Sequence, residues 1–417
     1  WLDLFGLGGV GYVAVGVFAP ERKQWGKWGA ILLVLEWHMV WAAGSGMETL
    51  LFAWIVTLVL VWIAAGWGHQ FWLGALIGLC AWVRPDGVTL LAPAGLGIWL
   101  AGGERQARLR ASGAVGLGFI LLFFPYLGFN RVLAGAWWPN TFFAKQAEYA
   151  ALQEVFIGTR LLEQLMLPLV GVGVVLLPGM LKLWWKAWEA KRWGLLVGVL
   201  WWVGYAGLYA WRLPVTYQHG RYLMPAMPIF FLWGLAGLMV WSWPRPRVLL
   251  CFGDYDPTQG EPWSWPRPRV LLLRVLARAW AWIAGVVLVI FWVQGARAYA
   301  LDVAFIESEM VVTAHWIAAN TETDALIAAH DIGALGYFGE RDIVDLAGLV
   351  SPEVISFIRD EERLKVYLDT TRVDYFLTLQ GWYPKLEAEQ SVRFVTGGQF
   401  APILGGSNMV LYQWSKP

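Results

Sequence analysis

The stretch Gly44-Ser-Gly-Met-Glu-Thr49 places one glutamate between two long apolar runs, Ile31–Ala43 and Leu50–Ala65. Apolar runs of this kind predict helices that lie in a hydrocarbon layer. An ionisable side chain at the edge of such a layer is costly, so a carboxylate there usually has a partner or a function. Glu48 is therefore either a functional carboxylate or a cap for the helix that begins near Leu50.

The composition is that of an integral membrane protein, because 58% of the 417 residues are hydrophobic and only 15% are charged. Soluble domains have about 45–50% apolar and about 25% charged residues. The 31 tryptophans suit many interfacial positions, where amphipathic rings settle at headgroup depth. A net charge of +1 predicts no attraction for nucleic acid. The two cysteines predict neither a disulfide framework nor a metal site.

The apolar runs predict about ten spans. The candidate spans are Leu4–Ala19, Gly29–Ala43, Leu50–Ala65, Phe71–Val83, Val88–Ala101, Ala114–Leu133, Leu161–Leu181, Gly194–Ala210, Leu223–Trp241 and Leu276–Val293. A spanning helix needs about 20 apolar residues, so Phe71–Val83 and Val88–Ala101 are short. They form either one bent span or a hairpin that turns at Arg84-Pro-Asp-Gly87.

Basic residues favour the hairpin. With it, the loops richest in lysine and arginine share one side, and an excess of such residues marks the cytoplasmic side. A single bent span would put Arg22 and Lys27 on the opposite side. The loops predicted on the extracytoplasmic face are Gly44–Thr49, Arg84–Gly87, Gly135–Glu163 and Arg212–Tyr222.

After Val293 the sequence becomes mixed polar with acidic clusters, so we predict a membrane domain at 1–298 and an extracytoplasmic α/β domain at 299–417. Strands and helices that alternate along the chain predict such a small α/β domain. The predicted strands are Ala325–Ala329, Asp342–Asp345, Tyr375–Leu379, Val392–Val395 and Met409–Gln413, with helices at Asp302–Asn320, Pro352–Arg359, Glu361–Thr371 and Tyr383–Glu389.

The turn Arg84-Pro-Asp-Gly87 carries two charges at membrane depth. It is either a structural turn with an internal pair, in which Asp86 accepts from backbone N–H groups, or an anchor for phosphate. The planar fork of an arginine suits phosphate, which favours Arg84 as that anchor.

Two further outer segments carry polar candidates. In Trp137–Lys145, Asn140 and Lys145 add donors for a sugar or a phosphate beside aromatic residues typical of the interface. In Tyr217–Tyr222, His219 and Arg221 precede a helix start, where a nearby cation favours anions. Snorkelling of Arg221 to the interface is the alternative.

Two pairs of polar residues have plainer explanations. Glu36 and His38 lie inside a predicted span, so we expect a buried pair that is hydrogen-bonded to neighbouring helices, with a proton or ion path as the alternative. His330 and Asp331 end a predicted strand, where we expect them to cap the turn rather than touch a ligand.

A family resemblance is carried by short motifs in a fixed order. They are Gly46-Met-Glu-Thr49, Arg84-Pro-Asp-Gly87, Pro139-Asn-Thr-Phe142 with Lys145, Gly220-Arg-Tyr-Leu-Met-Pro225, Asp331-Ile-Gly-Ala-Leu-Gly-Tyr-Phe338 and Asp345-Leu-Ala-Gly-Leu349. With them, nearly the whole chain resembles bacterial GT-C-type membrane glycosyltransferases, in particular the arabinofuranosyltransferase-like group with a C-terminal extracytoplasmic domain.

The resemblance implies a donor and a set of roles. Such enzymes take a sugar from a polyprenyl phosphate on the outer face of the plasma membrane and pass it to a glycan, lipid or protein acceptor. Glu48 takes the place of an acidic position in the second outer loop, as a catalytic residue or a metal ligand. The resemblance makes Arg84, Lys145 and Arg221 candidates for binding the lipid phosphate. The full set of predicted substrate-binding residues is Arg84, Asp86, Asn140, Lys145, His219, Arg221 and Tyr222.

The family's leading acid pair lies in a first outer loop, and this chain opens inside an apolar stretch, Leu2–Phe18. We therefore expect the chain to be truncated before its general base, and inactive in that form. The chemistry otherwise fits: Arg, Lys or a divalent cation (Mg²⁺ or Mn²⁺) stabilises the leaving phosphate, and a carboxylate accepts the proton of the acceptor hydroxyl. The alternative is a non-catalytic membrane scaffold or complex subunit with the same fold. A transporter ranks last, because it predicts paired inverted repeats.

Overall fold

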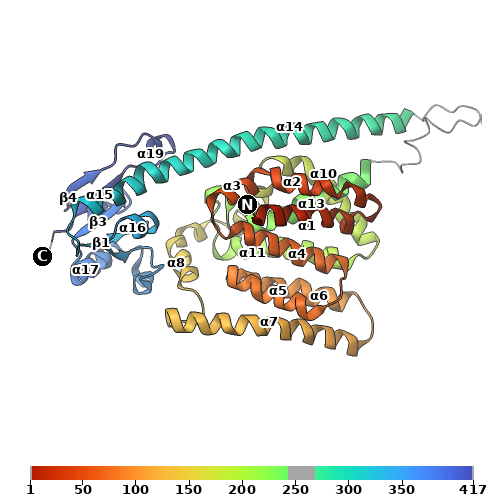
Figure 1. Cartoon of the computed structure of the whole chain (residues 1–417), viewed down its shortest axis with the longest axis horizontal. Coiled ribbons are helices and arrows are strands. Elements are labelled where there is room, and N and C mark those ends of the chain that lie inside the picture. Colours follow the sequence, from red (N-terminus) through yellow and green to blue (C-terminus); the bar gives the residue numbers. More distant parts are fainter. Residues whose placement is uncertain (1, 243–267, 416–417) are drawn as a thin grey trace, which may run out of the picture. The chain divides into compact units, whose positions relative to one another are not determined.

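The computed structural model describes residues 2–242 and 268–415 (Figure 1). Its contacts divide the chain into two compact units. The helical unit comprises Trp1–Tyr126 and Phe156–Ala296, and the sheet unit comprises Leu127–Val155 and Arg297–Pro417. Leu127–Val155, which the sequence predicted within the membrane domain, therefore belongs to the sheet unit. Most of the segment between the predicted spans Leu223–Trp241 and Leu276–Val293 lies outside the described residues.

The helical unit is built from apolar helices joined by short 3₁₀ turns. Its elements are α1 (Leu2–Phe18), η1 (Pro20–Trp25), α2 (Gly26–Leu35), α3 (Trp37–Ser45), α4 (Thr49–Ala65), α5 (Gln70–Val83), η2 (Pro85–Leu90), α6 (Leu91–Leu100), α7 (Arg105–Ala134), α9 (Ile157–Met166), η4 (Leu167–Leu169), α10 (Val172–Glu189), α11 (Trp193–Arg212), α12 (Tyr217–Gly220), η5 (Met224–Ala226), α13 (Met227–Ser242) and α14 (Pro268–Phe305). Two of them, α7 and α14, continue into the sheet unit.

Glycines bring α10 and α13 into backbone contact. A Cβ on Gly237 would lie 1.8 Å from the carbonyl oxygen of Gly179, and a Cβ on Gly179 would lie 2.2 Å from that of Gly234. Small residues allow this approach, and close approach drives helix association where lipid surrounds the protein. The neighbouring core side chains Phe230, Phe231 and Trp233 are fully or almost fully buried.

The predicted span Gly29–Ala43 is wrong in one respect, because it is two helices that meet at Glu36. Glu36 has extended backbone angles (φ −67°, ψ 127°), ends α2 and caps α3 by accepting from the backbone N–H groups of His38 and Met39. Its other oxygen lies 2.8 Å from Nδ1 of His38. Glu36 and His38 were expected to bond to neighbouring helices, but Glu36 bonds to the start of α3, the next helix in the chain. A buried carboxylate can satisfy N–H groups that a helix end leaves unpaired.

Four helices in the described part of the chain are long and apolar enough to cross a membrane: Arg105–Ala134, Trp193–Arg212, Tyr217–Val240 and Val275–Asn320. A fifth span results if the bent pair Ile157–Leu169 and Val172–Glu189 counts as one. The pair meets at an angle of 103°, with Gly171 at φ 104° in the break. Leu2–Phe18, Thr49–Ala65 and Gln70–Val83 are apolar but shorter. About ten spans therefore stays a prediction.

The sheet unit contains all five predicted strands. Its elements are α8 (Asn140–Glu148), η3 (Ala150–Glu154), η7 (Ile306–Val311), α15 (Val312–Asn320), β1 (Leu326–Ala329), α16 (Gly333–Phe338), β2 (Asp342–Asp345), η8 (Pro352–Phe357), α17 (Glu361–Thr371), β3 (Tyr375–Leu379), α18 (Pro384–Glu387), β4 (Ser391–Val395), α19 (Phe400–Ile403) and β5 (Met409–Gln413). The strand order is β2-β1-β3-β5-β4. Strand β1 is parallel to β2 and β3, whereas β5 is antiparallel to β3 and β4.

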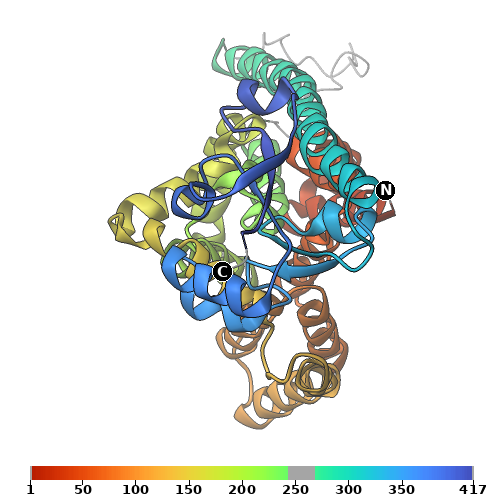
Figure 2. The ribbon, with the colours of Figure 1, turned by 90° about the vertical axis from the view of Figure 1, so that its left-hand side faces the viewer.

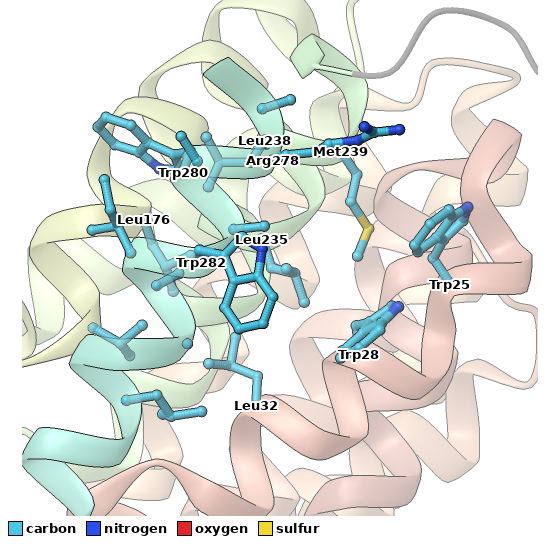
Figure 3. A pocket seen from close by; sticks show the side chains of 18 of the residues that line it. Trp25, Trp28, Leu32, Leu176, Leu235, Leu238, Met239, Arg278, Trp280 and Trp282 are labelled. Atoms are coloured by element: carbon cyan, nitrogen blue, oxygen red, sulfur yellow. The ribbon is translucent and has the colours of Figure 1, made fainter. Parts of the chain in front are cut away.

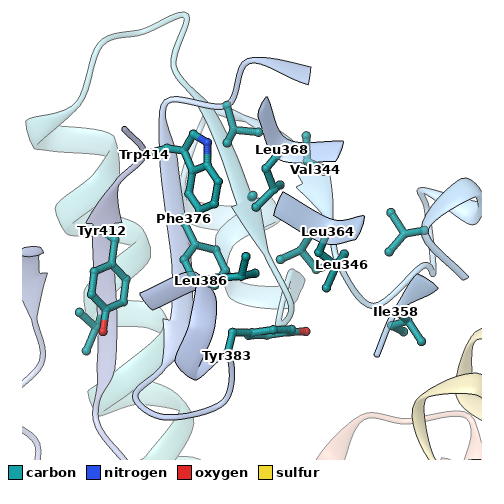
Figure 4. Packing of buried hydrophobic residues seen from close by; sticks show 14 residues of the cluster. Val344, Leu346, Ile358, Leu364, Leu368, Phe376, Tyr383, Leu386, Tyr412 and Trp414 are labelled. Atoms are coloured by element: carbon teal, nitrogen blue, oxygen red, sulfur yellow. The ribbon is translucent and has the colours of Figure 1, made fainter. Parts of the chain in front are cut away.

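The two faces of this sheet carry separate cores, because side chains alternate between the faces of a strand. On one face Phe376 and Ala328 pack with Leu364 and Leu368 of α17 and with Trp414 (Figure 4). The other face packs β1, β3 and β5 against α15 and α16. Figure 2 gives a second view of these elements, in blue.

Candidate functional site

Arg84 stands where α5 ends, and the turn that follows it folds back on that helix. Its backbone is extended (φ −148°, ψ 134°), and Pro85 opens the 3₁₀ turn η2. A Cβ on Gly87 would lie 2.9 Å from the backbone carbonyl carbon of Cys80, so the turn closes this tightly only with glycine there. The predicted break at Arg84–Gly87 is confirmed, and it leaves the Arg84 side chain 10% exposed.

Asp86 holds one edge of the Arg84 guanidinium. Nε of Arg84 lies 3.2 Å from Oδ1 of Asp86, and Nη2 lies 3.3 Å from Oδ2. Two hydroxyls complete the hydrogen bonding of this carboxylate, because Tyr205 donates to Oδ2 at 2.5 Å and Tyr209 donates to it at 2.6 Å. The expected acceptance from backbone N–H groups is thus replaced by side-chain donors. Paired and fully hydrogen-bonded, the two charges can stay buried.

The remaining nitrogen of Arg84 faces Glu48. Nη1 of Arg84 lies 3.7 Å from Oε1 of Glu48, whose side chain is 52% exposed. Glu48 precedes α4, yet its side chain makes no capping hydrogen bond within the described residues. Glu48 thus occupies the N-cap position of α4, as the capping explanation predicts, but its carboxylate forms a long, solvent-open contact with the buried cation in place of a capping hydrogen bond. Such a contact is weak enough for an anion or a hydroxyl to replace it.

Aromatic rings surround this guanidinium and connect it to Arg221. The Arg84 guanidinium lies 5.3 Å from the ring of Phe52 and 5.6 Å from that of Tyr222. Tyr222 stacks on Tyr209 at 5.7 Å and accepts at its hydroxyl from Nη2 of Arg221 at 2.9 Å. Arg221 also lies 4.8 Å from the Tyr222 ring. The result is a partly exposed face with two cations and one carboxylate, Glu48.

His219 is only two residues before Arg221 in the sequence, but its ring packs against other residues. Its backbone is left-handed (φ 60°), and its ring meets Trp37 and Trp41 edge-on at 5.3 and 5.1 Å. A left-handed histidine is strained unless its surroundings hold it, and the two indoles do so here. The structure thus gives His219 a packing role beside the predicted anion site.

Lys145 and Asn140 belong to the sheet unit. Asn140 begins α8 and is partly exposed. Nζ of Lys145 lies 2.6 Å from Oε2 of Glu148, and Oε1 of Glu148 lies 3.2 Å from Nε2 of His330. Nδ1 of His330 lies 2.8 Å from the hydroxyl of Tyr383. The expected turn cap at His330 is therefore wrong, because the ring ties α8 to the carboxyl ends of β1 and β3.

This cluster shifts the pKa values of its members. Burial alone would raise the pKa of Glu148, but hydrogen bonds from His330 and Lys145 and their charges lower it to about 2. Burial raises the pKa of the Tyr383 hydroxyl. Burial also raises the pKa of Asp331, against the opposing charges of His330 and Lys145. Glu148 is therefore a permanent anion at neutral pH.

The sequence analysis missed three groups of polar residues. Tyr205 and Tyr209 lie on one face of α11, and their spacing of four residues inside an apolar run was a usable signal. Arg160 and Gln164 have the same spacing on α9; they are 8% and 0% exposed, and Nε and Nη1 of Arg160 have no partner among the described residues. Glu148 had no signal that would set it apart from other acidic residues.

The residues of this site do not fit a protein-held metal ion. Across the described residues, no group of three His, Cys, Asp or Glu side chains could hold one. The oxygens of Asp86 are engaged by Arg84, Tyr205 and Tyr209, so Glu48 would be a lone ligand. Mg²⁺ prefers six oxygens in near-ideal geometry. Mg²⁺ or Mn²⁺ therefore stays a prediction from the sequence.

Comparison with solved structures defines the fold. The chain superposes on the crystal structure of ArnT from Cupriavidus metallidurans bound to undecaprenyl phosphate with a TM-score of 0.53 and 14% identity, covering 99% of this chain and 84% of that one. The apo state of the same protein gives a TM-score of 0.51 at 14% identity, over 98% and 83% of the two chains. The chain thus has the ArnT fold.

Sequence comparison adds one match. A family model described as Domain of unknown function (DUF8728) matches residues 301–412, which hold the sheet and its helices. No curated protein sequence matches the chain.

Proposed function

We propose that this protein is a membrane glycosyltransferase that takes a sugar from a polyprenyl phosphate. The observation that carries the proposal is the face formed by Arg84, Arg221 and Glu48. The fold shared with ArnT supports it, because that protein was crystallised with undecaprenyl phosphate. The resemblance to GT-C enzymes, which rests on the motifs around the same residues, agrees with that fold.

In this proposal the two arginines bind the phosphate. Nη1 of Arg84 and the guanidinium of Arg221 stabilise the anion that forms as the sugar leaves. Asp86, Tyr205 and Tyr209 hold Arg84 in one orientation, so little reorganisation accompanies the reaction. Tyr222 contacts both cations and keeps them on one face.

The bond changes balance without a further reactant. The bond between the anomeric carbon and the phosphate oxygen breaks, and a bond between that carbon and the acceptor hydroxyl oxygen forms. The phosphate leaves as polyprenyl phosphate, and the hydroxyl proton passes to a carboxylate. The sequence led us to expect a general base before residue 1 and an inactive chain without it. Glu48 is the exposed carboxylate next to the phosphate face, so we propose instead that Glu48 is the general base and that this chain is active.

The finer assignments are part of the same proposal. The enzyme belongs to the arabinofuranosyltransferase-like group, works at the outer face of the bacterial plasma membrane and has an extracytoplasmic sheet unit. Its acceptor is a glycan, lipid or protein. Asn140 and Lys145, on α8 of the sheet unit, offer donors for the acceptor or the sugar.

Binding of undecaprenyl phosphate to the full chain in nanodiscs tests the phosphate face. We expect Arg221→Gln to weaken binding roughly 10- to 100-fold, because a charge-assisted hydrogen bond contributes about 1.5–3 kcal/mol. Binding of undecaprenol, which has the same tail and no phosphate, should not change.

Arg131→Gln is the matched control, since Arg131 is an exposed arginine outside the face. Equal affinities of wild-type protein and Arg221→Gln for undecaprenyl phosphate would refute the proposed phosphate face. The same would follow if undecaprenol bound as tightly as its phosphate.

A further inference from the structure

A hollow of about 960 Å³ lies in the helical unit, away from the residues proposed to bind phosphate. Trp25, Trp28 and Leu32 line one side of it, and α14 closes the opposite side with Trp280 and Trp282 (Figure 3). Leu176 and Leu235 come from α10 and α13. None of Glu48, Arg84 and Arg221 lines the hollow.

Helix α14 contacts the other helices at a few points, which leaves the hollow open between them. Nε1 of Trp280 donates to the carbonyl of Val175 at 3.0 Å. A Cβ on Gly295 would lie 2.9 Å from Cβ of Trp37, and Phe291 meets the same indole at 6.5 Å. Within the described chain, no residue of the most apolar window of this helix is buried. The space between them is therefore accessible to an apolar occupant.

The lining is apolar apart from two cations. Arg22, which is 5% exposed, and Arg278, from α14, both line the hollow. Its described lining contains no acidic residue. Apolar walls with guanidinium groups match a ligand that has hydrocarbon chains and an anionic phosphate headgroup. Arg22 also belongs to the loops predicted on the cytoplasmic side, whereas Arg84 belongs to those predicted on the opposite side.

We propose that this hollow is a binding site for an anionic membrane phospholipid, with its chains against the tryptophans and its phosphate at Arg22 and Arg278. The site is separate from the proposed donor site. Basic pockets between membrane helices are known to hold anionic headgroups. An acyl chain in the hollow would also supply the packing that α14 lacks.

Lipid retention tests this site. The full chain would be stripped of lipid in detergent, incubated with phosphatidylglycerol, phosphatidylcholine or undecaprenyl phosphate, and analysed by native mass spectrometry. We expect phosphatidylglycerol to be retained at least tenfold more tightly than phosphatidylcholine. Arg278→Gln should weaken the binding of phosphatidylglycerol roughly fivefold. Adding Arg22→Gln should weaken this binding again by a similar factor.

A second variant tests the hollow itself. A Cβ on Gly285 meets nothing within 4 Å, and this residue lines the hollow, so Gly285→Trp should fill it and abolish retention of both phospholipids. The controls are Gly113→Trp, which is also open within 4 Å, and the exposed pair Arg105→Gln with Arg110→Gln. Both controls should retain lipid as the wild type does.

Three results would overturn the proposal. Equal retention of the two phospholipids would remove the role of the arginines, and unchanged retention in Gly285→Trp would place the lipid elsewhere. Displacement of phosphatidylglycerol by undecaprenyl phosphate, with loss of both in Gly285→Trp, would assign the hollow to the donor lipid. Binding of undecaprenyl phosphate at Arg221 is tested separately with Arg221→Gln, so the two proposals can fail independently.

Discussion

At Arg84 the chain places a guanidinium between a buried carboxylate and an exposed one. Asp86 and Tyr209 occupy Nε and Nη2, while Nη1 lies 3.7 Å from Glu48. The buried partner satisfies the charge in the absence of substrate and fixes the direction of the fork. The exposed partner is the one that an incoming phosphate can replace, because its contact is long and open to solvent.

Tyr209→Phe should loosen this arrangement without adding bulk. The hydroxyl of Tyr209 accepts from Arg84 and donates to Asp86, so its loss leaves a buried ion pair short of two contacts. We expect the free energy of unfolding to fall by about 1–3 kcal/mol and undecaprenyl phosphate to bind more weakly. Thermal unfolding and lipid binding of this variant would be compared with those of Tyr12→Phe, a change at an exposed tyrosine. Equal effects of the two changes would contradict the proposed role of Tyr209 in holding Arg84.

Arg160 is a buried cation for which the described residues provide no partner at Nε or Nη1. A buried charge without compensation is costly, and hydrophobic residues of similar volume often stabilise a protein in its place. We therefore expect Arg160→Met to raise the free energy of unfolding by about 1–4 kcal/mol. Chemical denaturation measures this. A destabilised Arg160→Met would show that the guanidinium has a bound anion or another partner.

Glu148 gives the sheet unit a defined acid sensitivity. Its pKa of about 2 lies below the ordinary value of 4.5, so its contacts stabilise the fold fully above about pH 4.5. That contribution, on the order of 1–3 kcal/mol, is lost as the pH falls toward 2. Wild type and Glu148→Gln should differ in stability at pH 6 and converge near pH 2. A difference that grows on acidification would contradict this assignment.

At the scale of elements, the apolar runs predicted where helices form but not where they break. Glu36 breaks a run because its carboxylate caps α3 from inside the protein. The run Leu161–Leu181 bends at Gly171, since only glycine readily adopts the positive φ found there. Both breaks depend on tertiary surroundings that hydropathy does not record. The five strands were predictable because short β-rich segments alternate with turn residues.

The contact between α10 and α13 should be sensitive to a single methyl group. A Cβ on Gly237 would lie 1.8 Å from the carbonyl oxygen of Gly179, so Gly237→Ala forces the helices apart. We expect a loss of at least about 1–3 kcal/mol, the usual cost of overpacking, measured by thermal unfolding in detergent. Gly204→Ala, on α11 where a Cβ meets nothing within 4 Å, should keep or raise the stability, because alanine favours a helix over glycine; a matching loss there would contradict the overpacking explanation.

At the scale of the whole molecule, the candidate site was predictable in part. The order of the motifs and the distribution of basic residues between the two sides of the membrane predicted five site residues. These are Glu48, Arg84, Asp86, Arg221 and Tyr222, which lie together in the helical unit. Lys145 was grouped with them, but it pairs with Glu148 in the sheet unit. A linear sequence does not show which loop folds with which unit, and tyrosines in apolar runs resemble interfacial anchors.

The central claim is that Glu48 and the arginines beside it transfer a sugar from a polyprenyl phosphate. The most direct measurement supplies the full chain in nanodiscs with an envelope extract that contains polyprenyl-phosphate sugars together with lipid, glycan and protein acceptors, and follows release of polyprenyl phosphate. We predict turnover by the wild type, about 10²- to 10⁴-fold slower turnover by Glu48→Gln, and no change in Glu163→Gln, at an exposed glutamate on α9. Wild-type turnover that Glu48→Gln leaves unchanged would contradict the account.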